Sequence, residues 1–245
     1  FFKYFSLQMI AVLSLAAAAY YLRGLSFDYS FTWNSIYLFP LTFIFGVQVP
    51  VILHNAVHYN ISIKTLNEVI GELCGFFVLF GMGPFRISHS LHHAYPDDPI
   101  KDPHPPMGKG FGYFLATTQV NTIKVISNVY FDKFGRNKET YSIMLAQMCC
   151  YYVGLIGRVF IWYTVLGPSN FVNFYLPAYM VNLVVFAHIN FATHQPDGAE
   201  GFHVVNLDNN LYYKILNVVS SGAYYHKNHH DYPKRYNPMI PQKVS

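Results

Sequence analysis

The sequence of 245 residues has few charged residues and few cysteines. Only 11% of the residues are Asp, Glu, Lys or Arg, whereas about a quarter is usual in a soluble domain. Cys74, Cys149 and Cys150 form no CxxC pair, so the sequence indicates neither a disulfide framework nor a thiolate metal site. It also lacks the HExxH motif of zinc proteases and the paired ExxH motifs of soluble di-iron proteins. These absences argue against a soluble protein with a common metal site.

The sequence is rich in hydrophobic residues, which make up 53% of it and are gathered in long apolar stretches. Four stretches approach the roughly 20 residues that cross a bilayer core as a helix: about 5–22, 36–53, 143–166 and 171–192. The run 69–83 is shorter, contains Glu72 and is broken by glycines, so we expect it to be a buried or interfacial segment. No repeat or linker divides the chain, and we expect a single domain over 1–245.

The connections between these stretches predict a topology. Residues 23–35 and the turn Pro168–Asn170 can each join two antiparallel helices, which places both turns on one side and the histidine clusters on the other. Of the 16 Lys and Arg residues, 14 belong to the histidine side, which is therefore expected to be cytoplasmic. We predict an all-α, multi-pass integral membrane protein with four transmembrane helices in two hairpins and a cytosolic helical cap. We expect the first stretch to be retained as a helix and not removed as a signal peptide.

The histidines are the candidate functional residues of this sequence. Nine of the 12 histidines fall in four clusters, HNAVH (54–58), HSLHH (89–93), NFATH (190–194) and HKNHH (226–230). Residues at i, i+3 and i+4 share one face of a helix, so each cluster directs its imidazoles to one side. In NFATH, Asn190 and His194 have the same i, i+4 spacing. This pattern is typical of metal ligands on helices.

The number of imidazoles and their apolar setting restrict the metal. One structural zinc takes four ligands, whereas two ions with four or five nitrogens each would use all nine histidines. The chain has no obvious hydrolytic nucleophile, and its apolar character favours dioxygen activation against a C–H bond, for which zinc has no redox capacity. Iron is favoured and copper stays open. Carboxylates near the clusters could orient the imidazoles. Among Asp97, Asp98, Asp102 and Asp231, we expect this role for Asp102 and Asp231.

Three segments resemble motifs of the membrane fatty acyl desaturases. HSLHHAYPDDPIKDPHPPMGKGF resembles their second histidine box, NFATH resembles the end of their last transmembrane helix, and HKNHHDYPKRY resembles their third box. The matches run in the family's order from His54 to Arg235. The resemblance implies an oxygen-dependent enzyme with two iron ions (Fe2+) that introduces a cis double bond into a lipid- or carrier-linked acyl chain. It also implies four transmembrane helices under a cytosolic domain.

The resemblance also implies roles for individual residues. The iron ligands, which would form the catalytic centre, would be His54, His58, His89, His92, His93, His194, His226, His229 and His230. Asn190 would bind the iron through a water molecule. His104, His188 and His203 match no ligand position. The chain shows no electron-carrier domain, so we expect a separate electron donor such as a cytochrome b5, a ferredoxin or a rubredoxin. The other expected partner is a membrane lipid, acyl-CoA or acyl-lipid substrate, with no nucleic acid.

Departures from the family pattern keep other functions open. The histidines of the first box are separated by three residues, as in acyl-lipid desaturases and many hydroxylases. Ser90 stands where arginine is common, and Ser221, Gly222 and Ala223 replace the usual Gly-Glu-Gly. The acyl carrier and the bond position therefore stay open. The alternatives are a membrane di-iron hydroxylase acting on alkanes or sterols, a carotenoid ketolase or hydroxylase, and a non-catalytic metal-binding membrane subunit.

Overall fold

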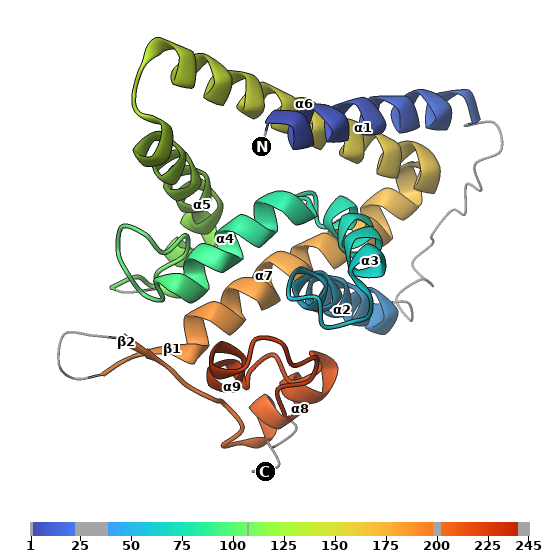
Figure 1. Ribbon diagram of the computed structural model, residues 1–245. Coiled ribbons are helices and arrows are strands. Elements are labelled where there is room, and N and C mark those ends of the chain that lie inside the picture. Colours follow the sequence, from blue (N-terminus) through green and yellow to red (C-terminus); the bar gives the residue numbers. More distant parts are fainter. Residues whose placement is uncertain (1, 23–38, 107, 198–201, 240–245) are drawn as a thin grey trace. The chain divides into compact units, whose positions relative to one another are not determined.

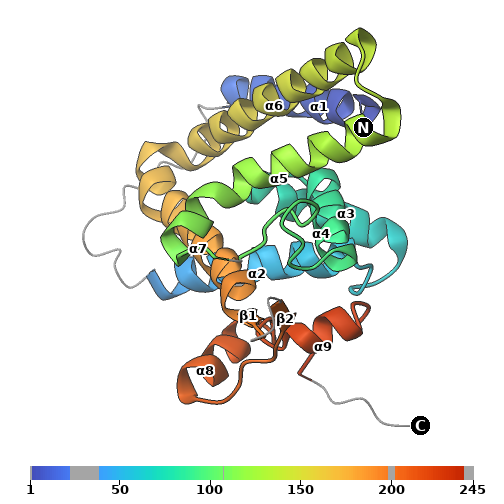
Figure 2. The ribbon, with the colours of Figure 1, turned by 90° about the vertical axis from the view of Figure 1, so that its left-hand side faces the viewer.

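The computed structural model describes residues 2–22, 39–106, 108–197 and 202–239, and these are mostly helical (Figures 1 and 2). In chain order the elements are α1 (Phe2–Leu22), α2 (Phe39–Val57), α3 (Lys64–Phe77), α4 (Met82–Ala94), α5 (Phe111–Phe134), α6 (Lys138–Asn170), the π-helix η3 (Phe171–Tyr175), α7 (Leu176–Thr193), β1 (His194–Pro196), β2 (Phe202–Val204), α8 (Leu211–Val219) and α9 (His226–Asp231). The helical class that the sequence predicts is confirmed.

The chain forms two compact units. The single domain that the sequence predicts stays a prediction. One unit contains Phe1–Phe43 and Ser127–Tyr179, and the other contains Ile44–Ile126 and Met180–Ser245. All four histidine clusters belong to the second unit, which therefore holds the candidate site by itself.

In the first unit, α1 lies along α6. Gly157 makes the close approach possible, because a Cβ atom at this position would lie 2.6 Å from Cγ1 of Val12. The Arg158 guanidinium is buried and donates a hydrogen bond of 2.5 Å to the amide oxygen Oε1 of Gln8. A charged side chain inside an apolar helix is thus held by a polar partner on the neighbouring helix.

The predicted membrane spans are confirmed only in part. Two helices in the described residues are long and apolar enough to cross a membrane, Phe39–Val57 and Lys138–Thr193, and a third span is possible if α3 and α4 together form one. The first predicted span appears as a shorter apolar helix, Ser6–Leu22. The arrangement in two hairpins remains a prediction. The predicted linker 23–35 lies outside the described residues.

The third and fourth predicted spans differ from the expected helix–turn–helix. Pro168, Ser169 and Asn170 are helical, and the interruption falls one residue earlier, at Gly167, which has φ 75° and ψ 160°. Glycine adopts this positive φ without steric cost, and the proline that follows disfavours a helical conformation in the residue before it. The sequence therefore predicts a break in the right region. Its prediction that Pro168, Ser169 and Asn170 form the turn is wrong, because these residues continue the helix.

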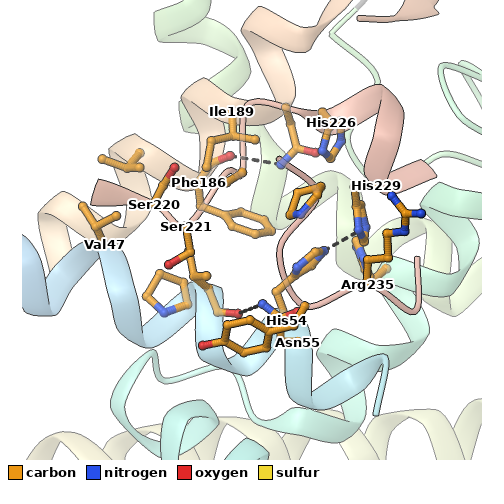
Figure 3. Close-up of a pocket in the computed structure, with 18 residues that line it drawn as sticks. Val47, His54, Asn55, Phe186, Ile189, Ser220, Ser221, His226, His229 and Arg235 are labelled. Carbon is orange, nitrogen blue, oxygen red and sulfur yellow. Dashed lines mark hydrogen bonds between the residues drawn. The ribbon is translucent and has the colours of Figure 1, made fainter. Parts of the chain in front are cut away.

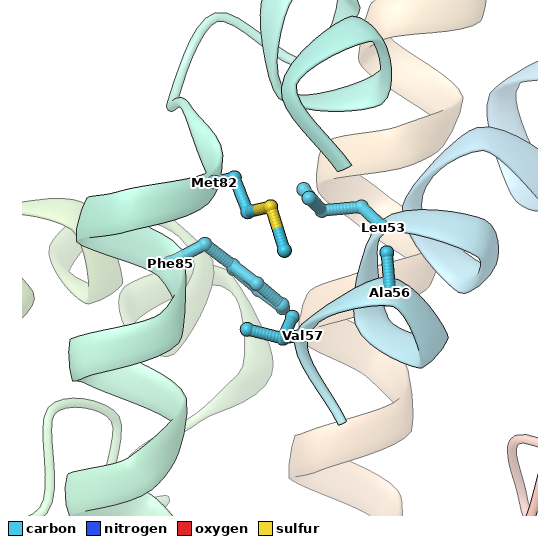
Figure 4. Packing of buried hydrophobic residues seen from close by; sticks show 5 residues of the cluster. All are labelled: Leu53, Ala56, Val57, Met82 and Phe85. Atoms are coloured by element: carbon cyan, nitrogen blue, oxygen red, sulfur yellow. The ribbon is translucent and has the colours of Figure 1, made fainter. Parts of the chain in front are cut away.

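The second unit brings α2 and α4 together. The predicted buried or interfacial run 69–83 falls on α3 and α4, two helices bent by 97° across a short break. Gly75 lies at this bend, where an added Cβ would be 2.7 Å from the backbone nitrogen of Met82. Figure 4 shows Met82 and Phe85 of α4 against apolar residues of α2, which are Leu53, Ala56 and Val57. This contact places two histidine clusters side by side.

Candidate metal centre

Three helices position the histidine boxes. His54 lies in the last turn of α2, and His58 follows one residue after its end. The second box lies on α4 and the third on α9, whereas His194 is the first residue of β1, directly after α7. The ring of Phe85 stacks on that of His89 at a centroid distance of 5.5 Å. The apolar contact between α2 and α4 therefore continues directly into the histidine cluster.

The nine histidines that the sequence singles out form two groups. Within each group the ligand nitrogens all lie within 4.8 Å of one another, which suits one ion, since metal–nitrogen bonds of about 2.0–2.1 Å place opposite ligands roughly 4 Å apart. The first group is His54, His58, His89, His93 and His229, and the second is His92, His194, His226 and His230. A third, smaller group of His92, Asp102 and His104 shares His92 with the second.

The short distances between the histidine nitrogens of the first group are better explained by a bound cation than by hydrogen bonds. Nε2 atoms face each other in a row, His58 to His89 at 2.8 Å, His89 to His93 at 3.0 Å, His93 to His229 at 2.9 Å and His229 to His54 at 3.0 Å. A neutral imidazole nitrogen carries either one proton or one lone pair, so these five nitrogens cannot satisfy all four contacts as hydrogen bonds. A metal ion would accept all five lone pairs at once.

Two carboxylates orient histidines of the second group. Nδ1 of His92 donates to Asp102, with 3.1 Å to each carboxylate oxygen, and Nδ1 of His194 donates to Asp97, with 2.9 Å to each. This arrangement leaves Nε2 as the ligand atom of both rings. Within the described residues, Nε2 of His92 and of His194 is buried and has no hydrogen-bond partner. A buried nitrogen of this kind is what a metal ion would bind.

The carboxylates differ in part from the expectation. Asp102 lies against a histidine as expected, and its oxygens also accept hydrogen bonds from the backbone N–H groups of Asp97 and His104. Asp231, by contrast, accepts from Lys227 at 2.8 Å on an exposed surface. Asp97 was not singled out, because its partner His194 is 97 residues away and no local spacing joins them.

Burial holds the third box in its neutral, metal-binding form. Desolvation lowers the pKa of His226 and of His229 well below the ordinary histidine value, and neighbouring histidines lower it further. The same causes lower the pKa of His230 to about 3. Imidazole binds a metal only when its nitrogen is deprotonated, so these rings are ready to bind at neutral pH.

A mainly apolar cavity borders both groups. The cavity is partly open to solvent. His54, His89 and His229 line it from the first group and His226 from the second. Figure 3 shows Val47 from α2 and Phe186 and Ile189 from α7 around the same space.

The polar residues of the cavity include Asn190 of α7, for which the family resemblance implies metal binding through water. Its amide Nδ2 donates to the Phe186 carbonyl at 3.0 Å, and the residue is almost fully buried. Ser220, Ser221 and Ala223 also line the cavity, so the segment that departs from the family pattern lies at this site.

The remaining histidines lie apart from the two groups or at their edge. His104 stacks on His92 with a centroid distance of 4.5 Å and is buried. Nδ1 of His188 and the Tyr224 hydroxyl share a hydrogen bond of 2.8 Å. His203 is exposed on β2. The structure therefore brings together the nine predicted histidines, with the expected Asp102 and the additional Asp97 behind them.

Comparison with known families agrees with this geometry. The model of the fatty acid desaturase family matches residues 5–243, nearly the whole chain. The chain therefore belongs to the fatty acid desaturase family, and its class is oxidoreductase. No curated protein matches the chain, and no solved structure does. Metal dependence is typical of the family and agrees with the two histidine groups.

Proposed function

We propose that the protein is an oxygen-dependent di-iron fatty acyl desaturase, which forms a cis double bond in a lipid- or carrier-linked acyl chain. The observation that supports this most directly is that one apolar cavity borders both histidine groups. A saturated acyl chain has no polar group near its central carbons, so an apolar wall beside the metal centre suits it.

The nine histidines would hold two iron ions, five histidines at one and four at the other. When bound, iron would supply the activation of dioxygen that zinc cannot provide. The reaction balances as –CH2–CH2– plus O2, two electrons and two protons to –CH=CH– and two molecules of water. Two of the four electrons that dioxygen accepts come from the C–H bonds, and a separate donor supplies the other two.

The chain's own residues would prepare the site for this reaction. Asp102 and Asp97 fix the tautomers of His92 and His194, so that Nε2 of each ring faces the metal. Val47, Phe186 and Ile189 would hold the acyl chain and exclude water from the reacting carbons. The amide of Asn190 would position a water molecule at the centre, since it lies in the same cavity.

The partners and location follow from the same proposal. The electron donor would be a separate cytochrome b5, ferredoxin or rubredoxin, and the substrate a membrane lipid, acyl-CoA or acyl-lipid. The protein would cross the membrane several times with the histidine boxes on the cytoplasmic face, in agreement with its apolar helices.

The product identifies the reaction. Total lipids of a host that expresses the protein with each candidate donor should be analysed by gas chromatography and mass spectrometry. We expect a new monounsaturated acyl chain with wild type and with His203→Ala, whose histidine is exposed and outside both groups, and none with His93→Ala. Hydroxylated or ketonic products would instead identify an oxygenase. A loss of product in His203→Ala equal to that in His93→Ala would contradict the assignment of the centre.

A further inference from the structure

Helix α8 has two apolar faces, and only one of them is covered in the described part of the chain. On the inner side, Tyr213 and Leu216 pack against a buried cluster of Ile189, Leu207 and Tyr224. Asn217 fixes this side, because its amide Nδ2 donates to the Leu207 carbonyl at 2.8 Å and its Oδ1 accepts from the Tyr224 backbone at 3.1 Å. The orientation of the helix about its axis is therefore set by internal contacts.

The outer side exposes large apolar side chains at helical spacing. Leu211, Ile215 and Val218 lie at i, i+4 and i+7 and are 73%, 54% and 72% exposed, and Tyr212 beside them is 55% exposed. We call these four residues the outer face of α8. A contiguous exposed apolar surface of this kind marks a site that another apolar phase or a partner covers.

We propose that the outer face of α8 inserts into the lipid bilayer at the boundary between headgroups and acyl chains. Amphipathic helices that lie in this plane bury one apolar face to a shallow depth. The inner side of α8 supports this placement, because it packs on a cluster that contains Ile189 of α7, and Val185 and Ala192 of α7 pack on the same cluster. These residues belong to the last turns of the candidate span Lys138–Thr193. Helix α8 thus lies against the end of a segment that is itself apolar enough for the membrane.

The composition of α8 also suits a lipid surface. The helix has no acidic residue, and its one charged residue is Lys214, which is exposed at the flank of the outer face. A lysine there can extend its ammonium group to anionic lipid headgroups while its alkyl part stays in the apolar layer. Tyrosine is enriched at the membrane–water interface, and the outer face of α8 contains Tyr212. Ser220 follows α8 directly and lines the cavity, so the insertion places the cavity at the membrane surface.

Fluorescence quenching of single labels tests the insertion. The full chain, with Cys74, Cys149 and Cys150 replaced by serine, should receive Ile215→Cys or Val218→Cys, and Lys214→Cys as the matched control on the same helix. Each variant is labelled with bimane and placed in nanodiscs of phosphatidylcholine and phosphatidylglycerol. Quenching is measured with acyl-chain nitroxide lipids and with aqueous iodide.

We expect the nitroxide lipids to quench the labels at 215 and 218 at least about twofold more than the label at 214, and iodide to show the opposite order. Equal iodide quenching at all three positions would mean that the face is in water and would overturn the proposal. Protection from both quenchers would mean that protein, such as a second copy of the chain, covers the face, and this result would also overturn it. An unchanged metal content would show that the variants are folded.

Discussion

Nδ1 of His194 lies 2.9 Å from both carboxylate oxygens of Asp97, although 97 residues separate the two in sequence. Both side chains are buried, so the contact is shielded from water. It connects the first residue after α7 to the loop that follows the second histidine box. One hydrogen bond thus joins two parts of the second unit that local spacing does not relate.

Removal of the Asp97 charge is expected to weaken metal binding at the second group. Asp97→Asn keeps an acceptor oxygen but lowers the basicity of the imidazole and allows the ring to flip. Substitutions of such outer carboxylates typically reduce metal affinity about 10- to 100-fold. Iron retention during titration with a chelator measures the effect. Asp231→Asn is the control, since this carboxylate contacts Lys227 on the surface and should leave retention unchanged. Equal effects of the two substitutions would contradict the role of Asp97.

The metal-free protein is expected to lose stability as the pH falls. Burial lowers the pKa of His226 and His229 well below the ordinary 6.5, and that of His230 to about 3. Below about pH 6.5 the unfolded chain therefore binds protons that the folded chain excludes, so stability falls from pH 6.5 downward. Each such histidine contributes on the order of 1–2 kcal/mol of this loss at pH 5. Thermal unfolding of the chelated protein from pH 7.5 to pH 5 measures it, and a constant Tm would contradict the prediction.

The bend between α3 and α4 is expected to tolerate no side chain at Gly75. A Cβ there would lie 2.7 Å from the Met82 nitrogen and 2.8 Å from the Gly81 Cα, and backbone atoms cannot move aside without shifting α4. Gly75→Ala should therefore destabilise the protein by about 1–3 kcal/mol and lower its iron content. At Gly71 the nearest atoms belong to the Met82 side chain, which is flexible, so Gly71→Ala should cost less. The order of the two Tm values is the measurement, and the reverse order would refute this explanation.

Filling the cavity is expected to change which acyl chains the protein accepts. Val185 of α7 lines the cavity, whereas its neighbour Val184 is 39% exposed and does not. Val185→Phe should reduce kcat/KM for a long acyl chain at least about tenfold, because a misfit of one or two methylene groups has an effect of this size. Val184→Phe is the matched control and should leave chain preference unchanged. An unaltered preference in Val185→Phe would show that the substrate lies elsewhere.

The sequence predicts the histidine centre well because its signal is local. Imidazoles at i, i+3 and i+4 share a helix face, and His89, His92 and His93 are indeed on one helix. The division of the nine histidines into groups of five and four was not predictable, because it depends on how α2, α4, α7 and α9 pack. For the same reason the sequence favours Asp231 over Asp97, although Asp97 is the one that contacts a histidine of the second group, since nearness in sequence says little about nearness across elements.

The fold was less predictable than the site. Hydrophobicity alone identifies α2 as a candidate span, but it cannot show that helical structure continues through Pro168, Ser169 and Asn170 after the break at Gly167. Proline is tolerated in the first turn of a helix, so Pro168 marks a helix start as readily as a turn.

The number of iron ions bound by single-group variants tests the central claim most directly. The purified protein should be loaded with Fe2+ under anaerobic conditions, freed of excess metal and analysed by inductively coupled plasma mass spectrometry. The two groups predict two irons per chain for wild type and about one each for His89→Ala and His226→Ala, which lie in different groups. One iron per chain in wild type, or a preference for zinc over iron, would contradict a di-iron centre held by these nine histidines.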